Sequence, residues 1–318
     1  MKKLAILLSR NHRLLSIAAM LDMFETVNIY MKEESGAAFF EISLFHTMDN
    51  EPVHYTGYLT RPIIAAEKQD LILLPAFGNV DPKTAVMANS EAIQWLQGQY
   101  KEGAAIASFC TGAFLLAATG LLNHRPATTH IQAVNAFVQA FPDVIMQPRS
   151  VVTEEDNVYT SGGATSSFHL MLKLVENYCG RDIAIRAAKY FAIDMDREQQ
   201  SYFSTFLPLS NHGDELVTMV QQKISKSFNT SNTIEQLLFE VPASRRNLVR
   251  RFKLATGITP IEYLQKTRIE AAKKLLEQSR RSILEVMLET GYNDLKSFRQ
   301  LFKKNVGLSP KAYREKFN

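Results

Sequence analysis

A cysteine at the end of an apolar run is well placed for chemistry in the first part of this chain. Cys110 follows residues 104–109, a run typical of a buried strand, and precedes Gly112, where a helix can begin. A thiolate at such a strand-to-helix turn is positioned as a nucleophile, and a helix N-terminus favours the thiolate by lowering the pKa of the thiol. Cysteine is also a common small core residue, and composition alone favours that interpretation.

A histidine twenty residues further on could exchange protons with that cysteine. His130 follows Thr128 and Thr129, and an imidazole can act as the general base for a thiol. A histidine near the start of a helix can equally bond only to backbone, so both interpretations stay open. Glycine-containing loops follow two other expected strands. Together these positions form a candidate ligand-binding set: Cys110, His130, Phe77, Gly78 and Gly163.

The last hundred residues suggest a different chemistry, because Lys and Arg side chains cluster there on two expected helices. Lysine and arginine neutralise phosphates, and arginine reads guanine through two parallel hydrogen bonds. Apolar side chains four apart, such as Leu248 with Phe252, define the buried face of each helix. The side chains that we expect to contact double-stranded DNA are Arg245, Arg246, Val249, Arg250, Lys296, Ser297, Arg299 and Gln300.

These two helices belong to a unit that occurs twice, 50 residues apart. The matched pairs are Phe252 and Phe302, Gly257 and Gly307, Pro260 and Pro310, and Tyr263 and Tyr313. Each copy predicts a short helix (234–239, 283–289), a turn and a second helix (245–255 in the first copy). Residues 261–278 predict a long helix between the copies. A helix-turn-helix with a basic second helix fits a DNA major groove, and repetition weighs against a merely basic surface helix.

The charge of the chain is divided in the same way. Residues 196–318 carry 21 Lys and Arg against 13 Asp and Glu, whereas residues 1–195 carry 15 against 19. The resulting net charges of +8 and −4 indicate one part that binds nucleic acid and one that does not.

The front of the chain alternates short apolar runs with amphipathic segments. Strands are expected at residues 4–8, 40–45, 71–74, 104–109 and 158–160. Helices are expected near residues 17–30, 90–101, 112–119, 131–140 and 166–178. Such alternation predicts an α/β domain, an open and mostly parallel sheet with helices on both faces, followed by an all-α domain.

Other features bound the class of protein. Two cysteines, Cys110 and Cys179, cannot form a disulfide framework, which favours a cytoplasmic protein. The N-terminal apolar run is too short for a signal peptide, and we expect no stretch to span a membrane. No metal site or cofactor is predicted.

The region from about 232 to 317 resembles the AraC-type DNA-binding domain. The resemblance rests on Gly291, Tyr292, Phe298, Phe302, Gly307, Pro310, Tyr313 and Arg314. It implies that the two basic helices enter successive major grooves, about 34 Å apart.

Residues 107–131, with 71–78 and 158–176, resemble the PfpI-type branch of the class I glutamine amidotransferase-like fold, which is flavodoxin-like. That branch carries a cysteine at the strand-to-helix turn and often a Thr-His pair some twenty residues later. Together with the AraC-type region, and with residues 197–203 between them, the chain resembles GlxA-type regulators.

The chain departs from the enzymes of that fold at one position. Their carboxylate beside the cysteine falls on Ser16 here, and Thr111 rather than histidine follows Cys110. We therefore expect a regulator and not an enzyme, with residues 1–195 as a sensing or dimerising domain, 196–215 as a linker and 216–318 as the DNA-binding domain. A homodimer formed by the first domain and a small-molecule effector are expected partners. The alternatives are a purely architectural front domain or a cysteine-dependent amidase, peptidase or hydratase that uses Cys110 and His130.

Overall fold

The computed structural model describes residues 1–47, 57–58, 60–78, 80–163, 165–195, 200–206, 208, 212–230, 233–239 and 241–318. They form two compact units, residues 1–200 (unit 1) and 201–318 (unit 2). Residues 196–199, 207 and 209–211 of the expected linker lie outside the described residues. The limits predicted from the sequence therefore stay a prediction.

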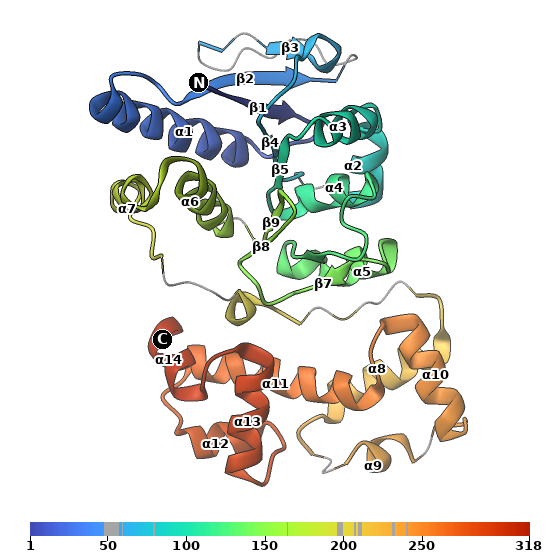
Figure 1. Cartoon of the computed structure of the whole chain (residues 1–318). Coiled ribbons are helices and arrows are strands. Elements are labelled where there is room, and N and C mark those ends of the chain that lie inside the picture. The colour runs from blue at the N-terminus through green and yellow to red at the C-terminus, as the bar shows by residue number, and fades with distance from the viewer. Residues whose placement is uncertain are drawn as a thin grey trace. The chain divides into compact units, whose positions relative to one another are not determined.

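Unit 1 is built on a seven-stranded sheet with the order β3-β2-β1-β4-β5-β9-β8 (Figure 1). All neighbouring strands are parallel except β8 and β9. The strands are β1 Lys2–Leu8, β2 Phe40–His46, β3 Thr60–Pro62, β4 Leu71–Leu74, β5 Ala105–Ser108, β8 Val152–Glu155 and β9 Val158–Ser161; a separate parallel pair is β6 Pro126–Ala127 and β7 Ile145–Met146. The five strands predicted from apolar runs are present. The strands that the sequence did not indicate are two or three residues long or, like β8, partly polar.

Helices cover both faces of this sheet because its strands alternate their side chains. Leu4 and Ile6 pack toward α1 Leu14–Ser35, α6 Ser166–Cys179 and α7 Arg181–Tyr190. Ala5 and Leu7 pack toward α2 Pro82–Ala88, α3 Glu91–Lys101, α4 Ala113–Ala118 and α5 Val134–Ala140. The predicted α/β class, a mostly parallel sheet with helices on both faces, is confirmed.

Helix α1 corrects one expectation. By length and composition it is long and apolar enough to cross a membrane, although no such stretch was predicted. In unit 1 it is a core helix, since Met20, Phe24 and Val27 are fully buried against the sheet and its neighbouring helices.

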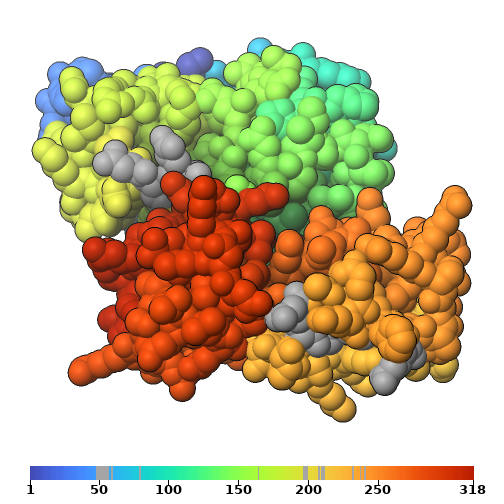
Figure 2. Space-filling view, turned by 90° about the horizontal axis from the view of Figure 1, so that it is seen from below, coloured from blue at the N-terminus to red at the C-terminus, as the bar shows by residue number. Residues whose placement is uncertain are grey.

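Unit 2 is helical and has two apolar cores joined by one helix. Its helices are α8 Glu215–Ser227, α9 Ile234–Leu238, α10 Arg245–Thr256, α11 Pro260–Gln278, α12 Ile283–Glu289, α13 Leu295–Val306 and α14 Pro310–Phe317. One core joins α8, α9, α10 and the start of α11, and the other joins the rest of α11 with α12, α13 and α14. Figure 2 shows these halves as two neighbouring lobes, orange and red. The predicted helix-turn-helix pair and the long joining helix are confirmed.

Local signals at the helix ends repeat between the halves. Ser244 accepts a hydrogen bond from the N–H of Asn247 at the start of α10, and Asp294 accepts one from Ser297 at the start of α13. Gly257 and Gly307 end these helices with φ angles of 78° and 89°, a left-handed conformation that glycine adopts without strain. The same backbone is therefore built twice.

Candidate nucleic-acid interface and the Cys110 pocket

The second helix of each helix-turn-helix carries most of its polar side chains in solvent. Leu248 and Phe252 of α10, and Phe298 and Phe302 of α13, are buried and hold the helices on their cores. All the expected contact residues except half-buried Val249 are exposed: Arg245, Arg246, Arg250, Lys296, Ser297, Arg299 and Gln300. The two helices thus present cationic and amide groups that can meet phosphates and base edges.

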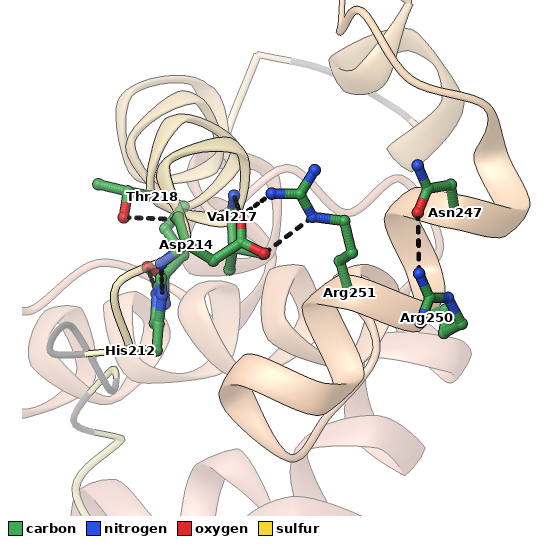
Figure 3. A network of polar contacts seen from close by, with 8 residues as sticks. His212, Asp214, Val217, Thr218, Asn247, Arg250 and Arg251 are labelled. Carbon is green, nitrogen blue, oxygen red and sulfur yellow. Dashed lines mark hydrogen bonds and ion pairs between the residues drawn. The ribbon is translucent and has the colours of Figure 1, made fainter.

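Arginines on α10 divide into two kinds. Arg251 turns toward α8, where its Nε and a terminal nitrogen donate to the carboxylate of Asp214 at 2.8 and 2.7 Å (Figure 3). Asp214 also caps α8 by accepting from the N–H of Val217. Arg250 lies on a different side of α10, where it donates to Asn247 Oδ1 at 3.4 Å and forms no ion pair with any of the described residues. Arg251 is therefore structural, whereas Arg250 is available to a ligand.

Two other expected contact residues of α10 have neighbours in their own half. Arg245 forms an exposed ion pair of 2.8 Å with Glu235, a kind of contact that contributes little to stability and is readily exchanged for a phosphate. Val249 lines an apolar pocket of about 310 Å³ between α9, α10 and the start of α11. Val249 therefore offers a methyl surface, and Arg245 offers a charge.

In unit 1, Cys110 lies at the strand-to-helix turn after β5, as the apolar run predicted. Its φ of 56° is left-handed, which is uncommon outside glycine and marks a sharp turn. Its carbonyl accepts from Thr129 Oγ1 at 2.9 Å, and its N–H donates to Ser161 Oγ at 3.4 Å. The turn is thus tied to the ends of two other segments of unit 1.

The prediction that the turn lowers the pKa of Cys110 is wrong. The side chain is only 4% exposed, and this burial raises the pKa of the thiol. Hydrogen bonds from Thr111 and the positive charge of Arg13 offset the burial only in part. Cys110 is therefore a buried, protonated thiol at neutral pH.

His130 lies beside the same pocket, and its Nδ1 accepts from the N–H of Gln132 at 3.3 Å. This is the backbone bond that the second interpretation of the histidine expected. Burial, and then the charge of Arg13, lowers the pKa of His130, so the imidazole is neutral at neutral pH. Ser16 stands in the pocket wall, and its hydroxyl accepts from the N–H of Ala76 at 3.1 Å. The serine therefore supports a loop instead of moving protons.

The pocket has a volume of about 390 Å³ and opens beyond the carboxyl ends of the strands, the edge at which such sheets bind ligands. Cys110, His130, Phe77 and Gly78 line it, together with Arg13, Thr111 and apolar side chains such as Phe168. No Asp or Glu lines it among the described residues. Arg13 donates its Nε–H to the carbonyl of Phe77 at 3.1 Å. Sequence reasoning missed Arg13, although its place in the turn after the first strand could have marked it.

Gly163, the fifth predicted residue, does not line this pocket but lies next to His130. A side chain at Gly163 would stand 3.3 Å from Cδ2 of His130, so the glycine allows the imidazole to pack against the loop after β9. Gly163 also donates its N–H to Oε1 of Gln200 at 2.9 Å, a residue that the sequence did not single out.

Comparisons with known proteins agree with this division. The DJ-1/PfpI family model matches residues 56–177, and a model described as a helix-turn-helix domain, of AraC type, matches residues 239–316. The chain therefore carries a DJ-1/PfpI-type domain followed by an AraC-type helix-turn-helix domain, and the resemblance inferred from the sequence is confirmed.

Several transcriptional regulators are similar to this chain over about two thirds of its length or more. The HTH-type transcriptional regulator GbdR of Pseudomonas aeruginosa is 27% identical over 71% of this chain and 61% of its own length. CdhR of the same organism is 27% identical over 77% of this chain and 71% of its own. GlxA of Rhizobium meliloti is 27% identical over 67% of this chain and 66% of its own length. The chain thus spans less than two thirds of the length of GbdR.

Solved structures share the fold of unit 1. An AraC family transcriptional regulator from Pseudomonas putida aligns with a TM-score of 0.51 and 16% identity, over 60% of this chain and all of that one. A ThiJ/PfpI family protein from Pseudomonas syringae aligns with a TM-score of 0.50 and 17% identity, over 84% of this chain and 88% of that one. At these identities the likeness concerns the fold alone.

Proposed function

We propose that this chain is a sequence-specific, DNA-binding transcriptional regulator that works in the cytoplasm and is not an enzyme. The observation that carries the proposal is the repeated helix-turn-helix, in which α10 and α13 hold the same scaffold positions and expose cationic and amide side chains. The names of GbdR, CdhR and GlxA as transcriptional regulators support it.

Within this proposal, α10 and α13 read bases in successive major grooves. The base readers are Arg246, Val249, Arg250, Lys296, Ser297 and Gln300, and Arg245 and Arg299 neutralise phosphates. The assignment of Arg250 as a base reader is supported by its exposure, whereas Arg251 is held by its ion pair with Asp214.

The test is binding of the full chain to duplexes selected from a random pool, measured by fluorescence anisotropy. Affinity should fall by a factor on the order of 10³–10⁵ between about 50 and 200 mM salt if six to ten phosphates are contacted. Arg246→Ala should weaken binding, whereas Lys83→Ala, which removes an exposed charge from α2, should not. Salt-insensitive binding, or equal effects of the two substitutions, would contradict the proposal.

Unit 1 serves, in this proposal, as a homodimerisation and sensing domain. Leu14 and Leu15, adjacent at the start of α1, are exposed apolar side chains that a second copy would cover. The Cys110 pocket, with an arginine and no carboxylate in its described lining, suits a small molecule with an anionic group. Sedimentation of the full chain should give a dimer at micromolar concentrations, and a strictly monomeric chain would remove this part of the proposal.

The enzyme alternative is less well supported. Burial raises the pKa of the Cys110 thiol, and Ser16 stands where the related enzymes have a carboxylate, so the thiol lacks the acid partner that assists it in those enzymes. Cys110→Ser should leave DNA affinity unchanged. Turnover on amide, ester or 2-oxoaldehyde substrates that disappears in Cys110→Ser would favour the enzyme.

A further inference from the structure

Gln200 is the last residue of unit 1, and its side chain is buried to 1% exposure among loops that are distant in sequence. Its Oε1 accepts from the N–H of Gly163 at 2.9 Å. Its Nε2 lies within hydrogen-bond distance of the Thr129 carbonyl at 3.0 Å and the Thr128 hydroxyl at 3.1 Å. The Pro148 carbonyl stands 3.2 Å from the same nitrogen. An amide held on both its oxygen and its nitrogen is fixed in one orientation.

Two of the groups that hold Gln200 contact residues that line the Cys110 pocket. Thr129 donates its hydroxyl to the carbonyl of Cys110 and directly precedes His130, which lines the cavity. Gly163 packs against the ring of His130. Thr129 and Gly163 therefore lie between the residues of the pocket and the Gln200 amide.

The next residue, Ser201, is the first of unit 2 and is anchored there. Its hydroxyl donates to the carbonyl of Val306, the last residue of α13, at 2.9 Å. Further along, the N–H of Phe206 donates to Glu270 on α11 at 3.1 Å, and the ring of Phe206 meets Tyr263 edge to face. Residues 201–206 thus contact both the recognition helix of the second half and the helix that joins the halves.

We infer that Gln200 is a positioning residue that couples the state of the Cys110 pocket to the DNA-binding helices of unit 2. The peptide bond from Gln200 to Ser201 joins a buried anchor in unit 1 to a buried anchor in unit 2, with no free residue between them. A change in the Thr128–His130 loop alters the hold on Gln200, and the covalent chain carries that change to Val306. The inference rests on the proposed function, since it assigns the regulation of the DNA-binding unit to that pocket.

A substitution at Gly162 can displace the Gln200 side chain without changing Gln200 itself. A Cβ at Gly162 would stand 2.2 Å from Oε1 of Gln200, so Gly162→Ala forces the amide out, while the backbone of Gly162 is not left-handed. Gly98→Ala on α3 is the matched control, because a Cβ there meets open space. Thermal unfolding of the full chain establishes that both variants are folded.

The experiment combines the release of Gln200 with a change in the pocket. His130→Ala is introduced into four forms of the full chain: the parent, Gln200→Ala, Gly162→Ala and Gly98→Ala. Each form is compared with and without His130→Ala. Amide hydrogen exchange of residues 201–206 and affinity for a selected duplex are measured. In the parent and in Gly98→Ala, His130→Ala should reduce protection of 201–206 and change affinity by about fivefold or more. In Gln200→Ala and Gly162→Ala it should add nothing.

The outcomes separate the inference from the proposed function. The coupling is overturned if His130→Ala changes protection and affinity equally in the parent and in Gln200→Ala, or if it changes neither in the parent. If the parent binds no duplex, the proposed function fails, and hydrogen exchange alone still decides whether Gln200 transmits the pocket change.

Discussion

The two helix-turn-helix halves of unit 2 share their scaffold and differ on their surfaces. Residues 50 apart take the same structural roles: Phe252 and Phe302 fill the cores, Gly257 and Gly307 end the helices, and Thr259 and Ser309 cap the next ones. Between the buried positions, three successive residues change, from Val249 to Arg299, from Arg250 to Gln300 and from Arg251 to Leu301.

This difference shows which positions folding constrains and which it leaves to recognition. A buried ring or a left-handed glycine has few substitutes, whereas an exposed side chain can be replaced at little cost in stability. The two halves therefore repeat one fold but offer different groups to DNA, and we expect an asymmetric binding site in which each half reads its own sequence.

The largest loss of stability is expected from substitutions in the two apolar cores of unit 2. Phe302→Ala and Phe252→Ala each remove a fully buried ring and should lower the free energy of unfolding by about 3–5 kcal/mol. Because the halves have separate cores, hydrogen exchange should increase mainly in the half that carries the substitution. Leu254→Ala, at an exposed position of α10, is the control. Equal loss of protection in both halves would show that they unfold as one.

A smaller effect is expected from the base readers. Arg250→Ala should weaken specific binding by about 1–3 kcal/mol and relax the preference at one base. Gln300→Ala should relax a different base, about one helical turn away. Sequencing of the duplexes selected by each variant measures both, with Lys83→Ala as the control. Loss of preference at the same base in both variants would break the comparison between the halves.

The helix-ending glycines should give matched effects. Gly257→Ala and Gly307→Ala place a Cβ at φ angles of 78° and 89°, which should cost about 1–2 kcal/mol in each half. Gly98→Ala, within α3, should instead stabilise by about 0.5–1 kcal/mol. Chemical denaturation of the full chain provides the values. A marked inequality between the two glycines would mean that the halves are not equivalent scaffolds.

The smallest change in stability is expected from the ion pair between Arg251 and Asp214, since Leu301 takes the place of Arg251 in the second half. The hydrogen bond from Arg251 lowers the pKa of Asp214, so the pair stabilises the fold above the ordinary aspartate pKa of 3.8 and this contribution is lost as pH falls through the lowered value. The difference in Tm between wild type and Asp214→Asn should therefore shrink as pH falls from about 5 to 3. A difference that does not vary with pH would exclude this role for the pair.

Much of unit 2 could be predicted because its signals are local. Caps such as Ser244 and Asp294, and glycines such as Gly257, act within a few residues of their own position, so helix limits follow from short stretches of sequence. The central strands of unit 1 followed from apolar runs. Helices α2, α7, α8 and α14 were not predicted. In α7, polar surface residues obscure the apolar stripe of Ile183, Ala184 and Ala187.

What the sequence alone determined is the α/β class of unit 1, its central strands and the repeated scaffold of unit 2, since these depend on periodicity and on local caps. Tertiary structure decided the state of individual groups. Arg250 and Arg251 are adjacent and identical in type, but only Arg251 meets Asp214, 37 residues away. Cys110 stands where a nucleophile would, but burial among Thr129, Ser161 and other distant residues keeps it protonated. Charge state depends on surroundings assembled by folding, and no local pattern encodes them.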